Sequence, residues 1–185
     1  MTIVESVKYE NTTGEGKEAY EKHEKNNSLT NMKKILLQDY ATYDAYMGWY
    51  TSWTRLGEIV GKKAATIYAH SISTTNNCML CSLFFVRDLR TLGIDPANLV
   101  LDEKEQLLSE LGQQIVKDPT NVSEQLFAEL KEHYTDNEIV AIVGFAGQMI
   151  ATNNFNSILK IDIDQSLLPL QGDFKPATWR TQTSE

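Results

Sequence analysis

The segment from Thr135 to Leu159 constrains the fold of this chain more than any other. It begins with Thr135-Asp136-Asn137-Glu138, in which a threonine and a glutamate three residues apart can satisfy each other's free backbone amides at the start of a helix. A long, mostly apolar run follows directly, over residues 139–159. The sequence therefore predicts a long helix in this segment.

Helical periodicity extends over most of the remaining chain. Apolar residues recur at steps of three and four from Met32 to Tyr50, which predicts one helix or a broken pair. Further helices are expected at residues 61–74, from Asn77 to Leu92 and at residues 103–116, and another begins at Asn121 or Ser123. We find no alternating strand pattern and no internal repeat. The predicted fold class is all-α, a single-domain bundle of about six or more helices.

Composition divides the chain into three parts. Residues 1–28 are rich in Glu, Lys, Asn, Thr and Gly, which predicts a loosely ordered N-terminal arm with a short helix near residues 17–25. Residues 29–164 hold the helical domain. Residues 165–185 contain Pro169, Gly172 and Pro176, which predict an extended tail whose apolar side chains lie against a surface.

Charge and composition argue against several classes of partner. The chain has 185 residues, 42% of them hydrophobic, and a net charge of -8 at pH 7, so nucleic acid and anionic membranes are not expected partners. We recognise no export signal and no run of apolar residues long enough to span a membrane. A cytoplasmic location is therefore expected, where a close pair of thiols is more often redox-active than a permanent disulfide.

The two cysteines are the main candidates for chemistry. Residues 76–81, NNCMLC, place Cys78 and Cys81 three positions apart on one helix face, where a disulfide closes with little backbone movement. Asparagine is a favoured N-cap, so both cysteines are expected in the first helical turn, where free amides and the helix dipole stabilise a thiolate. The alternative is a pair of buried cysteines that only pack well.

A metal site is not expected. A structural zinc site normally needs four ligands, and the chain has no second cysteine pair, while its histidines are scattered. They are His23, His70 and His133. The prediction is that the protein uses no metal and no other cofactor.

Two segments resemble the alkylhydroperoxidase D-like and carboxymuconolactone decarboxylase superfamily. Residues 66–95, TIYAHSISTTNNCMLCSLFFVRDLRTLGID, resemble its core, and residues 135–164 are similar to the following helix of its peroxidase-related members. With the upstream helix, the resemblance covers residues 30–164. It implies an all-helical bundle of the alkylhydroperoxidase D-like type, homo-oligomers (trimers or hexamers), a small peroxide or disulfide substrate and a protein reductant.

The resemblance also shows what this chain lacks. In active members a glutamate twelve residues before the first cysteine and a histidine four residues after the second deprotonate the reactive thiol through water. Thr66 and Phe85 occupy these positions, and neither accepts a proton at neutral pH. By the family order Cys81 attacks the peroxide and Cys78 resolves, although the helix dipole favours Cys78 as the more acidic thiol.

His70 is the one residue that could repair the lost proton relay. It lies one turn after Thr66 on the same helix face, and a helical hairpin around residues 76 and 77 would bring it near Cys81 or Ser82. The alternative is a hydrogen-bonded core histidine. The candidate catalytic residues are therefore Cys81, Cys78 and His70.

Other polar and aromatic residues have structural interpretations. The aromatic residues between Tyr40 and Trp53 could line an apolar cavity, but their helical spacing favours the core or a subunit interface. Asn153 and Asn156 are expected to cap or cross-link helices.

Three functions follow from these observations. The first is a thiol-dependent peroxidase or disulfide oxidoreductase that acts through the cysteine pair. The second is a non-catalytic helical oligomer for binding or assembly. The third is a lactone decarboxylase, whose acid and base residues we cannot locate in this sequence.

Overall fold

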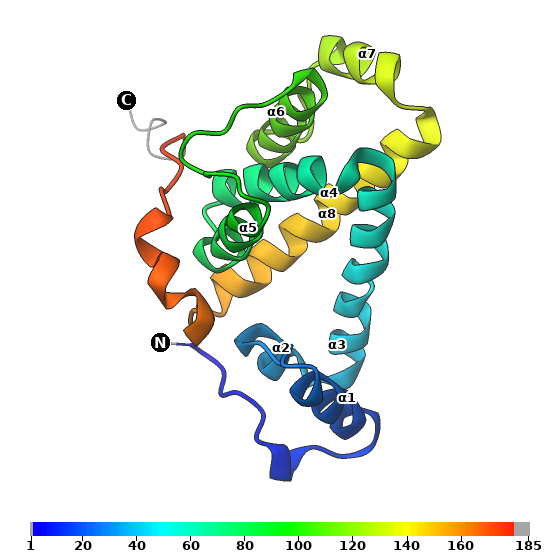
Figure 1. Cartoon of the computed structure of the whole chain (residues 1–185). Helices are drawn as coiled ribbons and strands as arrows, with labels where there is room; N and C mark the ends of the chain where they lie inside the picture. Colours follow the sequence, from blue (N-terminus) through cyan, green and yellow to red (C-terminus); the bar gives the residue numbers. More distant parts are fainter. Residues whose placement is uncertain (1, 180–185) are drawn as a thin grey trace.

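The computed structural model describes residues 2–179 of the chain. These residues form eight α-helices and two 3-10 helices, joined by loops (Figure 1). No strand occurs in these residues. The predicted all-α fold class, with six or more helices in a single domain, is confirmed.

The first helices form an N-terminal lobe, which we define as residues 9–47. It contains the 3-10 helix η1 (Tyr9–Asn11) and helices α1 (Gly14–Lys25), α2 (Asn31–Leu36) and α3 (Tyr40–Met47). Asp39 separates the last two, because its carboxylate accepts a hydrogen bond from Thr42 N at 2.8 Å and caps α3. The predicted helix between residues 32 and 50 is thus a broken pair. The lobe has its own small core, formed by Tyr20, Leu36, Leu37 and Tyr43 together with Val7, which precedes the lobe.

The segment predicted as a loosely ordered arm contains α1 and packs against other elements. Backbone hydrogen bonds join Val7 N to Lys34 O at 3.1 Å and Ile3 N to Leu159 O at 2.9 Å. Tyr20 of α1 is buried. The division at residue 28 stays a prediction.

Helix α4 (Trp49–Thr75) connects the lobe to the rest of the molecule. It bends at Gly61, whose φ of 79° lies in the region that glycine adopts without strain. The predicted helix of residues 61–74 is the second half of this longer helix. After the bend α4 packs among α5 (Met79–Thr91), α6 (Glu103–Lys117) and α8 (Asp136–Ile158). Tyr68 and Phe145, both fully buried, meet at the centre with ring centroids 6.1 Å apart.

Helices α4 and α6 approach closely at Gly112. A Cβ atom at this position would lie 2.9 Å from both Ile72 Cγ1 and Ser71 Oγ. We expect Gly112→Ala to lower the free energy of unfolding by about 1–3 kcal/mol, because the extra methyl group overfills the interface. Urea titration measures this effect. Gly147→Ala on α8 is the control, since nothing lies within 4 Å of its added Cβ, and equal losses in both variants would contradict the prediction.

Side-chain caps begin the later helices as the sequence predicts. Glu138 Oε2 accepts from Thr135 N at 2.8 Å and Thr135 Oγ1 accepts from Glu138 N at 3.4 Å, so the predicted capping box of α8 is confirmed. Ser123, one of the two predicted starts, caps α7 (Glu124–His133). None of the helices in the described residues is both long enough and apolar enough to cross a membrane.

The C-terminal segment differs from the predicted extended tail in its first half. Residues Gln165–Asp173 form the 3-10 helix η2, which packs against α5 and buries Leu167. Residues 174–178, which follow it, have no regular secondary structure, and residue 179 lies in a turn. There Trp179 Nε1 donates to Thr75 O at 2.8 Å. Residues 180–185 of the predicted tail lie outside the described residues.

Candidate active site

Cys78, rather than an asparagine, is the N-cap of α5. The prediction of an Asn76 or Asn77 cap is wrong because Asn77 adopts a left-handed backbone conformation, with φ of 58°, which asparagine tolerates and which ends the preceding turn. Cys78 then takes the extended cap conformation, and its Sγ accepts a hydrogen bond from Cys81 N at 3.4 Å. The cysteines therefore occupy the cap and the first turn of α5.

The two free thiols are buried and coupled. Cys78 is 2% exposed and Cys81 4% exposed, and a spacing of three residues on a helix suits a disulfide. The hydrogen bond from the Cys81 thiol, aided by the Cys81 backbone N–H, lowers the pKa of Cys78 despite its burial. Burial, followed by the neighbouring Cys78, raises the pKa of Cys81 well above its usual value. Cys78 is therefore the first of the pair to carry a negative charge, the direction that the helix dipole favours.

Asn156 of α8 is the residue that contacts the second thiol. Its Nδ2 donates to Cys81 Sγ at 3.1 Å, and its side chain is almost fully buried. Its Oδ1 is buried without a hydrogen-bond partner. Sequence reasoning treated Asn156 only as a cap or cross-link. One feature of the sequence indicates a role in the site: residues 153–156, NNFN, place three asparagines near the end of an otherwise apolar helix.

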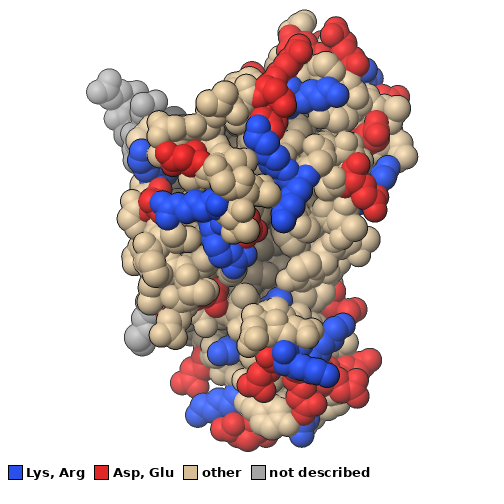
Figure 2. Space-filling view, in the orientation of Figure 1, with Lys and Arg blue, Asp and Glu red and all other residues tan. Residues whose placement is uncertain are grey.

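A cavity of about 530 Å³ lies between the N-terminal lobe and helices α4, α5 and α8. Figure 2 shows the surface hollowed between the lobe, at the lower end of the view, and the rest of the molecule. Cys81 lines this cavity, together with Asn156, whereas Cys78 does not. The volume falls within the range of small-molecule sites. The thiol that faces the cavity is therefore the less acidic of the two.

Four aromatic rings form one wall of the cavity. The centroids of Tyr50 and Trp49 lie 5.2 Å apart, those of Trp49 and Trp53 5.3 Å, and those of Trp53 and Phe85 5.9 Å. All four residues line the cavity. Part of the aromatic cluster at residues 40–53 thus lines a cavity, which the sequence analysis gave as the less favoured alternative. Trp49 and Trp53 also pack against the core.

The two positions of the family's proton relay hold no proton acceptor. Thr66 is buried, and its Oγ1 donates to Lys62 O at 2.8 Å. Phe85 is part of the aromatic wall. Within residues 2–179, no group of three or more His, Cys, Asp or Glu side chains is placed to hold a metal ion.

His70 lies near the thiol pair but does not contact either sulfur. Its Nε2 is 3.4 Å from Thr74 Oγ1, which is 3.5 Å from Ser82 Oγ, and Ser82 Oγ donates to Cys78 O at 2.8 Å. This chain of side chains reaches the backbone of Cys78. His70 does not line the cavity, and its catalytic role stays a prediction.

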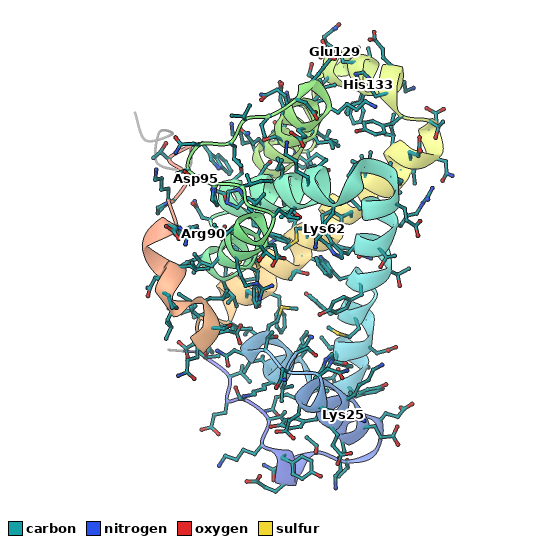
Figure 3. All side chains as sticks on the ribbon, in the orientation of Figure 1. Lys25, Lys62, Arg90, Asp95, Glu129 and His133 are labelled. Carbon is teal, nitrogen blue, oxygen red and sulfur yellow. The ribbon has the colours of Figure 1, made fainter. Side chains whose placement is uncertain are left out.

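The other two histidines lie away from the thiols. His23 belongs to the N-terminal lobe. Figure 3 shows His133 on α7, at the opposite end of the molecule from Lys25 of α1.

The buried His70 should make stability depend on pH. Burial lowers its pKa from 6.5 to about 4, so the unfolded chain binds a proton at a higher pH than the folded protein does. The contribution of the neutral His70 to the free energy of unfolding is therefore complete above pH 6.5 and is lost as the pH falls toward 4. We expect His70 to account for a loss on the order of 2 kcal/mol in unfolding free energy between pH 7 and 4.5. Urea titrations at both values, on wild type and His70→Gln, measure it, and equal losses in the two proteins would contradict it.

Comparisons with known proteins support the fold. No protein-family model matches the sequence, and no curated protein sequence matches it. The crystal structure of an uncharacterized peroxidase-related protein from Silicibacter sp. TM1040 superimposes on this chain with a TM-score of 0.72 and 16% sequence identity, covering 94% of this chain and 96% of that one. This chain therefore shares, over nearly its whole length, the fold of a peroxidase-related protein.

Proposed function

We propose that this protein is a thiol-dependent peroxidase that reduces an organic hydroperoxide through Cys81 and Cys78. The observation that carries the proposal is the position of Cys81. Its sulfur accepts the Asn156 N–H at 3.1 Å in a buried site, and the residue lines a cavity large enough for an organic molecule. The shared fold with a peroxidase-related protein supports the same conclusion.

Cys78 supplies the proton acceptor that Thr66 and Phe85 cannot. Because the thiols are hydrogen-bonded and Cys78 ionises first, the Cys78 thiolate takes the proton of Cys81. Asn156 Nδ2 then stabilises the negative charge on the Cys81 sulfur. A pair of coupled thiols thus replaces the glutamate and histidine of the resembling family.

The reaction balances with one hydroperoxide and two thiols. The Cys81 thiolate attacks the terminal oxygen, the O–O bond breaks, and the departing alkoxide takes the proton from Cys78 to become an alcohol. Cys81 is left as a sulfenic acid. The Cys78 thiolate attacks its sulfur, a disulfide forms, and the released hydroxide takes a solvent proton to become water.

A protein dithiol restores the reduced pair by thiol–disulfide exchange. The same exchange would let the pair act as a disulfide oxidoreductase. A cytoplasmic location belongs to this proposal, because that compartment supplies reduced dithiols.

Peroxide consumption with excess dithiothreitol tests the proposal. We expect cumene hydroperoxide to be consumed, with one cumyl alcohol formed for each. Without reductant, mass spectrometry should find one Cys78–Cys81 disulfide for each hydroperoxide reduced. Thiols that stay reduced in the presence of the hydroperoxide would overturn it.

The exposed face of α8 favours a second role, in assembly. Val140 and Ile158 are 71% and 69% exposed, and Val143 is also exposed, so this mainly apolar helix leaves one side uncovered. We propose a homo-oligomer, a trimer or hexamer, that buries this face. Light scattering should give a mass about three or six times the 20.9 kDa of one chain. Val140→Lys should shift the mass toward that of the monomer, and a wild-type monomer at all concentrations would contradict the proposal.

A further inference from the structure

Lys33 places a buried positive charge in the wall of the cavity. The residue is 5% exposed, and its Nζ donates to Ser28 O at 2.8 Å and lies 5.3 Å from the centre of the Tyr50 ring. Among residues 2–179, no carboxylate lies within ion-pair distance of this Nζ. Burial of a charge is costly unless it is paired, and no ion pair with a described residue offsets this cost at Lys33.

The neighbouring histidine orients Lys33 without neutralising it. Lys33 Nζ is 3.3 Å from His23 Nδ1 and can only donate, so Nδ1 is the acceptor and the ring proton lies on Nε2, 2.6 Å from Tyr43 OH. Burial and the charge of Lys33 lower the pKa of His23 to about 4, which leaves the ring neutral at pH 7. His23 therefore adds no second positive charge beside Lys33.

The aromatic wall connects Lys33 to the reactive thiol. It starts at Tyr50, beside Lys33, and continues through Trp49 and Trp53 to Phe85. Phe85 lies one helical turn after Cys81 on α5. The cavity thus has a cation at one end, a thiol at the other and an apolar wall between them.

The other charged residues described in the cavity form no ion pair with Lys33. Arg87 forms its ion pair with Asp88 at 2.8 Å. Asp164 Oδ1 accepts from Asn31 N at 2.8 Å, and its Oδ2 is buried without a hydrogen-bond partner. Burial raises the pKa of Asp164, and the charges of Lys34, Lys33 and Arg87 oppose that shift, but no hydrogen bond or ion pair joins this carboxyl to Lys33.

We propose that the cavity binds an amphipathic organic anion, with its carboxylate on Lys33 and its apolar body along the aromatic wall. The part of the molecule that reaches Cys81 carries the hydroperoxide group. This last statement rests on the proposed function, whereas recognition of the carboxylate rests on Lys33 and the wall alone. A carboxylate at Lys33 supplies the missing ion pair to a side chain that is only 5% exposed.

Binding of decanoate to the reduced protein tests the proposal without peroxide. Quenching of tryptophan fluorescence should report binding at Trp49 and Trp53, and 1-decanol serves as the uncharged probe of equal chain length. We expect decanoate to bind at least about tenfold more tightly than 1-decanol. Lys33→Met should remove this preference and leave 1-decanol binding unchanged.

Two further variants serve as controls for the effect of charge near the cavity. Lys34→Met removes the adjacent lysine, which does not line the cavity, and should leave both affinities unchanged. Asp164→Asn removes a cavity-lining carboxyl that forms no ion pair with Lys33 and should keep decanoate binding equal or make it tighter. Thermal unfolding checks that Lys33→Met is folded. Equal affinities for the two probes, or a decanoate affinity unaffected by Lys33→Met, would overturn the proposal.

The binding experiment and the peroxidase assay can fail independently of each other. Cys81→Ser should bind decanoate as tightly as wild type, because the carboxylate contacts Lys33. A protein that binds decanoate but consumes no hydroperoxide would contradict only the peroxidase. If the wild-type protein reduces hydroperoxides, Lys33→Met should raise KM about tenfold or more for a fatty-acid hydroperoxide and leave KM for cumene hydroperoxide unchanged. An active enzyme without this difference would contradict only the anion site.

Discussion

Replacing Cys81 with serine should reduce hydroperoxide turnover by at least about a thousandfold. A serine hydroxyl keeps nearly the same volume but does not ionise near neutral pH, so no nucleophile forms in the cavity. Asn156 would then donate to a neutral hydroxyl instead of the sulfur that it contacts at 3.1 Å. Peroxide consumption with excess dithiothreitol measures the loss.

Cys78→Ser is the matched variant, because it keeps the thiol that faces the cavity. It should stop after one turnover and leave a sulfenic acid on Cys81, which a dimedone adduct identifies by mass spectrometry. Its first turnover should also be slower than in wild type, since the proton acceptor is missing. A dimedone adduct on Cys78 in Cys81→Ser, formed at the wild-type rate, would instead identify Cys78 as the attacking thiol.

The helices were predictable because their signals are local. Thr135 and Glu138 are three residues apart, and the capping box that they form depends on little else. The predictions failed where one residue's backbone decides the outcome. Asn77 was expected to cap α5 but adopts a left-handed conformation, which shifts the cap to Cys78. The kink at Gly61 likewise divides α4, and the predicted helices left residues 51–60 of its first half unassigned.

The site was less predictable because it depends on contacts between distant segments. Asn156 is 75 residues from Cys81, and the packing of both α5 and α8 against α4 brings them together. Lys33 looks like any surface lysine in the sequence, and its burial follows from the fold of the N-terminal lobe around His23 and Ser28. The cysteine pair could be predicted because both thiols lie in one helical turn.

Replacing Asn156 with leucine should slow both thiol alkylation and hydroperoxide turnover by about ten- to a hundredfold. A hydrogen bond to a charged group contributes about 1.5–3 kcal/mol, and the Asn156 N–H, together with the Cys81 backbone N–H, lowers the pKa of Cys81 against its burial. Leucine has a similar volume and removes the unpartnered Oδ1 as well. The rate of iodoacetamide alkylation as a function of pH should show the thiol titrating at a higher pH than in wild type.

Asn153→Leu is the control that separates this role from a structural one. Asn153 is also buried on α8 and has an unpartnered side-chain atom, but its Oδ1 accepts from Ser73 Oγ at 3.3 Å instead of contacting a thiol. Both variants should change the unfolding free energy, and only Asn156→Leu should shift the alkylation profile. Asn156→Asp should shift it further, since a carboxylate beside the sulfur disfavours a second negative charge. Identical profiles in wild type and Asn156→Leu would show that the N–H does not stabilise the thiolate, and the proton acceptor and charge stabiliser of Cys81 would both have to be found elsewhere.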